Sequence, residues 1–214
     1  MTHAFLVAAL VMIRTYNYLG VPAGDLARAR ETADRTFQQA GISLQWLDCG
    51  VGPSSIVERP SIVDRPASIV QRPSSSVERE SACGRPLREG IDFVLRLASS
   101  PVDESHSPSR IVAMGTSLIN HDSRAGALTT VDAALVLNIA RGSGVDFGTL
   151  LGRAIAHEMG HLLLGHSQHS RDGLMRAIWS QDEIRGIRTA GWQFSAAEAV
   201  EMRQGLAARS RSAN

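Results

Sequence analysis

The chain has 214 residues, of which 43% are hydrophobic, and this is enough to build one domain around a buried core. Its 22 basic residues nearly balance its 21 acidic residues, and every basic residue is an arginine. These arginines form no basic stripe, which argues against nucleic acid as a partner. An apolar run at Ala4–Met12 is too short to cross a bilayer, so we expect no stable membrane span. The sequence therefore predicts a single domain over residues 1–214.

Residues 1–12 permit two interpretations. The run Ala4–Met12 has the length of the apolar part of a signal peptide, although no basic segment precedes it and no small-residue cleavage site follows it. In the other interpretation, the run leads directly into the first strand. We favour a residual signal segment, which predicts a secreted or periplasmic protein, with a cytoplasmic protein as the alternative.

A strand, a helix and a second strand are predicted next. Apolar residues alternate over Val11–Tyr18, and Asp25 is a suitable cap for a helix that continues to Ala40. Alternation resumes over Ile42–Trp46. Strand, helix and strand in this order predict a right-handed parallel crossover, with the helix backing the sheet.

The two cysteines, Cys49 and Cys83, flank a low-complexity insertion at residues 54–80. The insertion contains the hexapeptides SIVERP, SIVDRP and SIVQRP, followed by a degenerate SSVER. The repeat period is far below that of solenoid proteins, and the recurring proline prevents a regular strand ladder. We therefore expect an expanded loop with no domain of its own. Cysteines at the two roots of such a loop predict a disulfide bond in an oxidising compartment.

Two further strands are predicted at Ile91–Leu97 and Ile111–Leu118, where apolar and polar residues alternate. The stretch Gly126–Ala140 is apolar and favours β-structure. It leads into Arg141–Gly144, which we interpret as a flexible hinge before the next helix.

The C-terminal part is predicted to be helical. Arg176–Arg188 suits a short helix with one apolar face. A capping box of Ser195 and Glu198 begins a closing helix at Ala196–Ala208, and Arg209–Asn214 is expected to be a frayed tail. In the short helix at Arg176–Arg188, we expect three residues to face inward: Ile178, Trp179 and Ile184.

The stretch Asp146–Met175 carries four of the seven histidines. Asp146 is a suitable N-cap, apolar residues follow at helical intervals, and Gly165 is a suitable stop, which predicts a helix over Phe147–Leu164. Gly160 lies inside this helix although glycine costs about 1 kcal/mol relative to alanine there. The position of this glycine argues against a chance pattern.

Within this helix the sequence reads HExxH, with His157, Glu158 and His161. Residues four apart project from one helix face, so the two imidazoles can bind one metal ion. Glu158 then lies on the flank where a metal-activated water is expected. Two buried imidazoles and a carboxylate on an otherwise apolar helix would be costly without a shared partner.

A catalytic zinc ion takes three protein ligands and keeps one position open, so a third ligand is expected downstream. The candidates are His166, His169 and Glu183, the last of which would resemble a thermolysin-like arrangement. His166 follows Gly165 directly, whereas His169 lies four positions after it and leaves the chain room to reverse direction. We therefore predict Zn²⁺ as the cofactor, with three histidine ligands: His157, His161 and His169.

The order HExxH, glycine, histidine and methionine resembles the metzincin zinc metallopeptidases, whose pattern is HExxHxxGxxH followed by a Met-turn. This chain has HExxHxxxGxxxH, so Gly165 falls one residue late and His169 two residues late. Gly173-Leu174-Met175 matches the Met-turn. The string also resembles a group of uncharacterised bacterial proteins with HExxHLLLG, a histidine and a Gly-Leu/Ile-Met. The metzincin resemblance implies that a strand edge at Gly126–Ala134 pairs with an extended substrate.

We expect an α+β, metzincin-like fold, with a twisted mixed sheet of four or five strands, a backing helix, the zinc helix and a small helical C-terminal part. The expected function is a zinc-dependent peptidase, a metalloendopeptidase, with a metal-activated water and Glu158 as the general base. Its expected partner is a peptide or protein substrate.

Two alternatives remain open at the level of the sequence. One is a non-catalytic zinc-binding protein, which would have no use for a general base at Glu158. The other is a deformylase-type amidohydrolase, whose third ligand is an upstream cysteine in a context that Cys83-Gly84-Arg85 does not reproduce. The sequence predicts no oligomeric state.

Overall fold

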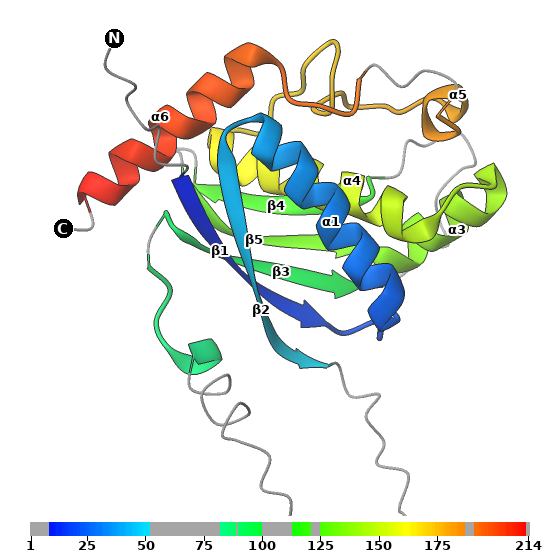
Figure 1. Cartoon of the computed structure of the whole chain (residues 1–214), viewed down its shortest axis with the longest axis horizontal. Coiled ribbons are helices and arrows are strands. Elements are labelled where there is room, and N and C mark those ends of the chain that lie inside the picture. The colour runs from blue at the N-terminus through cyan, green and yellow to red at the C-terminus, as the bar shows by residue number, and fades with distance from the viewer. Residues whose placement is uncertain are drawn as a thin grey trace, which may run out of the picture.

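A computed structural model describes residues 9–51, 82–88, 90–99, 113–120, 125–186 and 191–212. These residues contain a five-stranded sheet in the order β2-β1-β3-β5-β4 (Figure 1). Neighbouring strands are parallel except for β4, which pairs antiparallel with β5 at one edge of the sheet. The strands are β1 (Ala9–Asn17), β2 (Ile42–Val51), β3 (Asp92–Ala98), β4 (Gly115–Asn120) and β5 (Ala125–Asp132).

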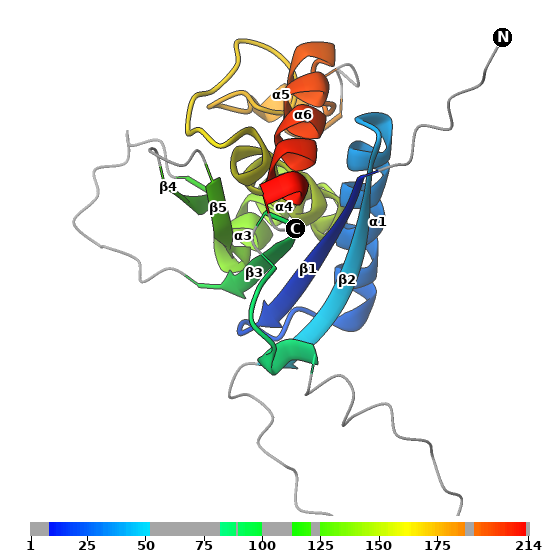
Figure 2. The same cartoon turned by 90° about the vertical axis from the view of Figure 1, so that its left-hand side faces the viewer.

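The helices lie on one side of this sheet (Figure 2). This arrangement confirms the α+β fold with a twisted mixed sheet, a backing helix and a helix that carries HExxH. None of the described helices is long and apolar enough to cross a membrane. The helices are α1 (Ala23–Gln39), α3 (Ala133–Ser143), α4 (Phe147–Leu164), α5 (Gln181–Ile184) and α6 (Ala196–Ser212).

The core lies between the sheet and the pair formed by α1 and α4. Alternate residues of the central strands are fully buried, as period-two alternation on a half-covered sheet predicts. Helices α1 and α4 approach each other closely, because a Cβ on Gly152 would lie only 2.4 Å from the Ala29 carbonyl oxygen. This close approach brings α4 under the edge of the sheet that β4 and β5 form. The fully buried residues of the central strands are Val11, Ile13, Phe93, Leu95 and Leu97.

The N-terminal apolar run belongs in part to the sheet. β1 begins at Ala9, and Val11 is fully buried, so Ala9–Met12 is strand. Residues 1–8 lie outside the described residues. Helix α1 begins at Ala23 with Pro22 at the N-cap position, so the predicted cap at Asp25 was wrong by three residues. Asp25 lies in the first turn and pairs with Arg28, where a carboxylate still stabilises the helix N-terminus.

The interpretation of Gly126–Ala140 as one β-prone stretch was wrong. β5 ends at Asp132, whose carboxylate accepts a hydrogen bond of 2.9 Å from the Leu135 amide and thereby caps α3. The expected hinge is also absent from this region, because α3 continues to Ser143 and Gly144 ends it in the left-handed conformation at φ 68°. An aspartate before an apolar run thus marked a helix start that alternation alone did not reveal.

The predicted helix at Arg176–Arg188 was too long, because α5 covers only Gln181–Ile184. A capping box of Ser180 and Glu183 starts it late, and Gly186 follows at φ 75°. Ile178 was expected to face inward but is 57% exposed, whereas Trp179 is half-buried and Ile184 is buried.

Helix α6 begins with the predicted capping box. The Ser195 amide donates to Glu198 Oε2 (2.7 Å), and the Glu198 amide donates to Ser195 Oγ (3.2 Å). The expectation of a frayed tail from Arg209 was wrong, because α6 continues to Ser212. Arg209 donates to the carbonyl oxygens of Leu162 and Leu163, which satisfies acceptors that the end of α4 leaves free.

Cys49 and Cys83 form the predicted disulfide bond, with their Cα atoms 5.4 Å apart. The buried Arg14 holds the chain next to this bond, because its guanidinium donates to the Cys83 carbonyl oxygen at 3.2 Å and pairs with Asp92 at 3.0 Å. The predicted insertion at residues 54–80 lies outside the described residues.

Candidate metal centre and active site

Helix α4 carries the HExxH residues and has the predicted bounds. The Asp146 carboxylate accepts a hydrogen bond from the Thr149 amide (2.7 Å), and Gly165 ends the helix at φ 71°. Most of its residues are buried against the sheet, α1 and the C-terminal part. The helix is therefore a fixed support for whatever side chains it presents to the cleft beneath β4.

His157 and His161 are buried and oriented by backbone carbonyl groups. Nδ1 of His157 lies 2.9 Å from the Leu174 oxygen, and Nδ1 of His161 lies 3.0 Å from the His166 oxygen. A carbonyl accepts only from a protonated nitrogen, so each ring carries its proton on Nδ1 and leaves an Nε2 lone pair. The two Nε2 atoms face each other at 3.2 Å.

His169 completes a group of three imidazoles. The potential ligand atoms of His157, His161 and His169 all lie within 4.8 Å of one another. The His169 ring centroid is 5.4 Å from that of His157 and 4.9 Å from that of His161. Three neutral histidines suit zinc, and this donor set leaves a fourth coordination position for water or substrate.

The other two candidate ligands lie elsewhere. His166 supports His161 through its backbone oxygen, and its ring is not part of the group. Glu183 caps α5, where its carboxylate accepts hydrogen bonds of 2.8 Å from the amide and hydroxyl of Ser180. Glu183 also pairs with Arg176 at 3.3 Å.

The Met-turn residues pack directly beneath α4. Met175 is fully buried, and a Cβ on Gly160 would lie 2.6 Å from its sulfur atom and 2.8 Å from the Phe194 ring. Glycine at this position therefore permits the Met-turn to approach the helix closely. This approach places the Leu174 carbonyl oxygen against His157.

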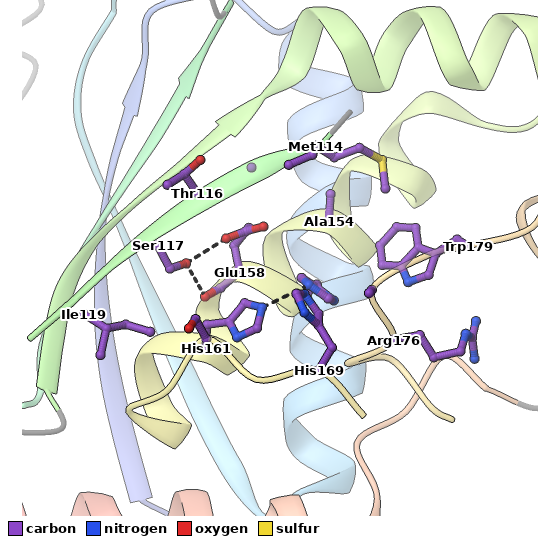
Figure 3. Close-up of a pocket in the computed structure, with 15 residues that line it drawn as sticks. Met114, Thr116, Ser117, Ile119, Ala154, Glu158, His161, His169, Arg176 and Trp179 are labelled. Carbon is purple, nitrogen blue, oxygen red and sulfur yellow. Dashed lines mark hydrogen bonds between the residues drawn. The ribbon is translucent and has the colours of Figure 1, made fainter. Parts of the chain in front are cut away.

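Glu158 lies on the side of α4 that faces β4 (Figure 3). Ser117 Oγ lies 2.7 Å from Glu158 Oε2 and 2.8 Å from the Glu158 backbone oxygen. A Cβ on Gly115 would lie 2.6 Å from the Glu158 side chain, so glycine makes room for it. Burial raises the pKa of Glu158 to about 7, while the Ser117 hydrogen bond acts in the opposite direction.

Burial also keeps the imidazoles neutral. It lowers the pKa of His157, and together with the neighbouring His157 ring it lowers the pKa of His161 to about 4. At neutral pH both rings are therefore unprotonated at Nε2, as metal ligation requires.

These groups open into a pocket of about 390 Å³ (Figure 3). β4 forms one wall of the pocket, and Trp179 stands at the opposite wall against the His157 ring at 5.6 Å. The predicted substrate edge at Gly126–Ala134 was wrong, because β5 pairs with strands on both sides. The edge strand at the pocket is β4 instead.

Sequence reasoning found the histidines and Glu158 but missed Gly115 and Ser117. Ser117 lies 41 positions before Glu158 and belongs to no local motif. Its only sequence signal is its place in a predicted strand.

Neither a protein-family model nor a curated protein sequence matches this chain. Two solved structures are similar to it in fold. An archaemetzincin from Methanopyrus kandleri has a TM-score of 0.54 at 12% identity, covering 94% of this chain and 98% of the archaemetzincin. A zinc-dependent peptidase from Methanocorpusculum labreanum has a TM-score of 0.51 at 15% identity, covering 89% and 99% respectively. The fold is therefore metzincin-like, as the resemblance of the HExxH region implies.

Proposed function

We propose that the protein is a zinc-dependent metalloendopeptidase in which His157, His161 and His169 hold the metal. The observation that carries this proposal is the convergence of three imidazoles, within 4.8 Å of one another, in the same pocket as the Glu158 carboxyl group. A purely structural metal site needs no carboxyl group of this kind beside it. The similar folds of a metzincin and a zinc-dependent peptidase support the same conclusion.

Bound Zn²⁺ supplies a Lewis acid that polarises a carbonyl group and lowers the pKa of a water molecule from about 15.7 to about 7. The orientation of His157 and His161 by backbone carbonyl oxygens suits this role, because it fixes the Nε2 lone pairs towards a shared point.

Glu158 is the proposed general base. Its carboxylate takes a proton from the attacking water and later passes that proton to the leaving amine. Its raised pKa, about 7, lies near the value at which a group both accepts and releases a proton efficiently. Ser117 holds one carboxylate oxygen at 2.7 Å, and the Glu158 side chain lines the pocket.

The substrate is a peptide in an extended conformation. Among the described strands, β4 lies at the edge of the sheet, and its residues Gly115 and Ser117 line the pocket. An exposed strand edge binds an extended peptide through main-chain hydrogen bonds. This mode requires no free terminus, and we therefore propose an endopeptidase.

We further propose that the protein acts in a secreted or periplasmic location. The Cys49–Cys83 disulfide supports this proposal, because such bonds persist mainly in oxidising compartments. The disulfide also argues against a deformylase-type centre, since Cys83 is bonded to Cys49 and is not a free ligand.

The test combines metal analysis with cleavage of a broad peptide library that includes N-formylmethionyl peptides. We expect about one zinc ion per chain, cleavage within unmodified peptides, and loss of cleavage on chelation with recovery on added zinc. Stoichiometric zinc without cleavage of any peptide would favour a non-catalytic zinc protein. Preferential removal of formyl groups would favour an amidohydrolase.

A further inference from the structure

A second pocket, of about 280 Å³, lies beside the first two turns of α4. We call it the arginine pocket, because Arg153 and Arg185 line it together with Asp146, Thr149 and Ile184. Arg153 comes from α4, and Ile184 ends α5, which lies at the same end of the molecule as α3 (Figure 1). None of these residues has a role in the proposed metal centre.

Arg153 is held in a fixed orientation without an anionic partner. Its guanidinium stacks at 4.0 Å over the ring of Trp192, which is only 9% exposed. Within the part of the chain that the structure describes, Arg153 makes no ion pair and no side-chain hydrogen bond. Burial lowers its pKa. The N–H groups of a guanidinium lie in its own plane, so a guanidinium that lies over an indole ring can still donate them to an oxyanion.

The residues that line the pocket include two arginines and one aspartate, so the lining carries a net positive charge. Arg185 is exposed and, among the described residues, also has no ion pair. Asp146 is the acidic group in the lining, but its carboxylate is already engaged. It accepts hydrogen bonds from the amide (2.7 Å) and hydroxyl (2.8 Å) of Thr149, and it pairs with Arg28 at 3.2 Å. Two arginines thus line the cavity without an ion-pair partner among the described residues.

The arginine pocket is close to the metal centre. Arg153 lies one helical turn before His157 on α4. Three contacts connect them: Arg153 to Trp192 at 4.0 Å, Trp192 to Trp179 at 4.8 Å, and Trp179 to His157 at 5.6 Å. An extended peptide advances about 3.3 Å per residue, so roughly four or five residues at most span this path. Figure 3 shows Trp179 and Met114 on one side of the active-site pocket and Ile119 of β4 on the other side.

We propose that the arginine pocket binds a carboxylate group of the peptide substrate, and that this contact selects peptides with an acidic group a few residues from the cleaved bond. The proposal rests on the proposed peptidase function and names its substrate class. Planar carboxylates fit the paired N–H groups of arginine, and the pocket has room for one acidic side chain or one chain terminus.

The first experiment compares peptides that differ only by glutamate or glutamine at one position, moved stepwise along both sides of the cleaved bond. At one position we expect the kcat/KM of the glutamate peptide to exceed that of the glutamine peptide by about tenfold. Arg153→Lys and Arg185→Gln should each reduce this ratio towards one. Arg141→Gln is the matched control, because Arg141 is exposed at the end of α3 and lines neither pocket, so the ratio should persist.

A binding measurement separates the two proposals. Tryptophan fluorescence reports on Trp192 and Trp179, and peptides titrated into zinc-loaded Glu158→Gln protein bind without being cleaved. We expect tighter binding of the glutamate peptide, and loss of the preference when Arg153→Lys is added. Preference in binding without cleavage by the parent protein would reject only the peptidase function. Cleavage with a glutamate/glutamine ratio of one at every position, together with no effect of C-terminal amidation on kcat/KM, would reject only the arginine pocket.

The source of the carboxylate is resolved with the same peptides. If a free C-terminus is the ligand, C-terminal amidation lowers kcat/KM and an internal glutamate confers no preference. If a side chain is the ligand, the glutamate preference is present and amidation has no effect. Inorganic phosphate is the third probe. Arginine-dependent phosphate binding together with no preference among peptides would overturn the proposal in favour of a free-anion site.

Discussion

Helix α4 and the segment that follows it, residues 165–176, contribute to the same metal centre in different ways. On α4 the spacing of His157 and His161 alone places both imidazoles on one face. The following segment contains no helix or strand, and its shape depends on contacts with the rest of the chain. The Leu174 amide donates to the Gln193 oxygen, and the Ser170 amide donates to the Met175 oxygen, each at 2.9 Å.

This difference separates local from nonlocal information. A helical motif specifies its geometry through the backbone repeat, so its function is readable from a few residues. The position of His169 depends on Gly165, on the Met-turn and on its contacts beneath α4. Changes in the two regions should therefore have different consequences, and the following predictions test this.

The largest effect is expected on the helix, from Glu158→Gln. Glutamine keeps the size of the side chain and can still pair with Ser117, but it accepts no proton at this step. We expect peptide hydrolysis to fall by about 10²–10⁴-fold, with zinc content unchanged by metal analysis. Hydrolysis at the parental rate would contradict the assignment of Glu158 as the general base.

In the following segment, His169→Ala should lower zinc affinity more than His166→Ala. His169 contributes an imidazole to the group of three, whereas His166 contributes a backbone oxygen that alanine retains. Competition with a chromogenic chelator should show a loss for His169→Ala above the roughly 10–100-fold typical of a group that only orients a ligand. The reverse ranking would show that His166 is the third ligand.

The contact between the two regions is tested by Gly160→Ala. Alanine favours helices by about 1 kcal/mol over glycine, but here its Cβ would lie 2.6 Å from the Met175 sulfur. Overpacking costs about 1–3 kcal/mol, so we expect net destabilisation in chemical denaturation. Gly142→Ala is the control, because among the described residues no atom outside its own helix backbone and chain neighbours lies within 4 Å of its Cβ position in α3, and it should stabilise. Equal stabilisation by both changes would show that the Met-turn adapts freely.

A smaller effect on catalysis is expected from Ser117→Ala. The hydroxyl holds Glu158 Oε2 at 2.7 Å, and one hydrogen bond to a charged group is worth about 1.5–3 kcal/mol. We expect kcat to fall roughly tenfold while KM changes little, because Ser117 acts through Glu158. Ser117→Thr retains the hydroxyl and should recover much of the rate. A change confined to KM would assign Ser117 to substrate binding instead.

The smallest effect is predicted for removal of the repeats. Deleting residues 55–79 while retaining Cys49 and Cys83 should leave zinc content and the thermal midpoint nearly unchanged. The described residues, including α4 and the following segment, form a buried core among themselves. A loss of folding after the deletion would show that the repeats are part of the core.

The sequence predicted elements whose signals are local. Asp146 and Gly165 bounded α4, and alternation revealed β1, β2 and β3. It failed for α3, because an apolar run after Asp132 suits a strand as well as a buried helix.

Prediction from the sequence also failed for features that depend on strand order. β4 precedes β5 in the chain but lies outside it in the sheet, so the strand at the edge beside the pocket could not be read from the chain order. The roles of Ser117 and Arg209 depend on partners 41 and 46 or more positions away, and no periodicity reports such contacts.

The disulfide between Cys49 and Cys83 also affects how the chain can change over time. It fixes the two roots of the intervening segment with Cα atoms 5.4 Å apart, whatever number of residues lies between them. Loop-closure entropy rises by only about 0.6 kcal/mol for each doubling of length, and a closed disulfide imposes that closure on the unfolded chain as well. Duplication or loss of one hexapeptide copy should thus be nearly neutral for stability. If the repeats lie outside the core, slippage during replication should lengthen or shorten this tract at little cost in loop-closure free energy.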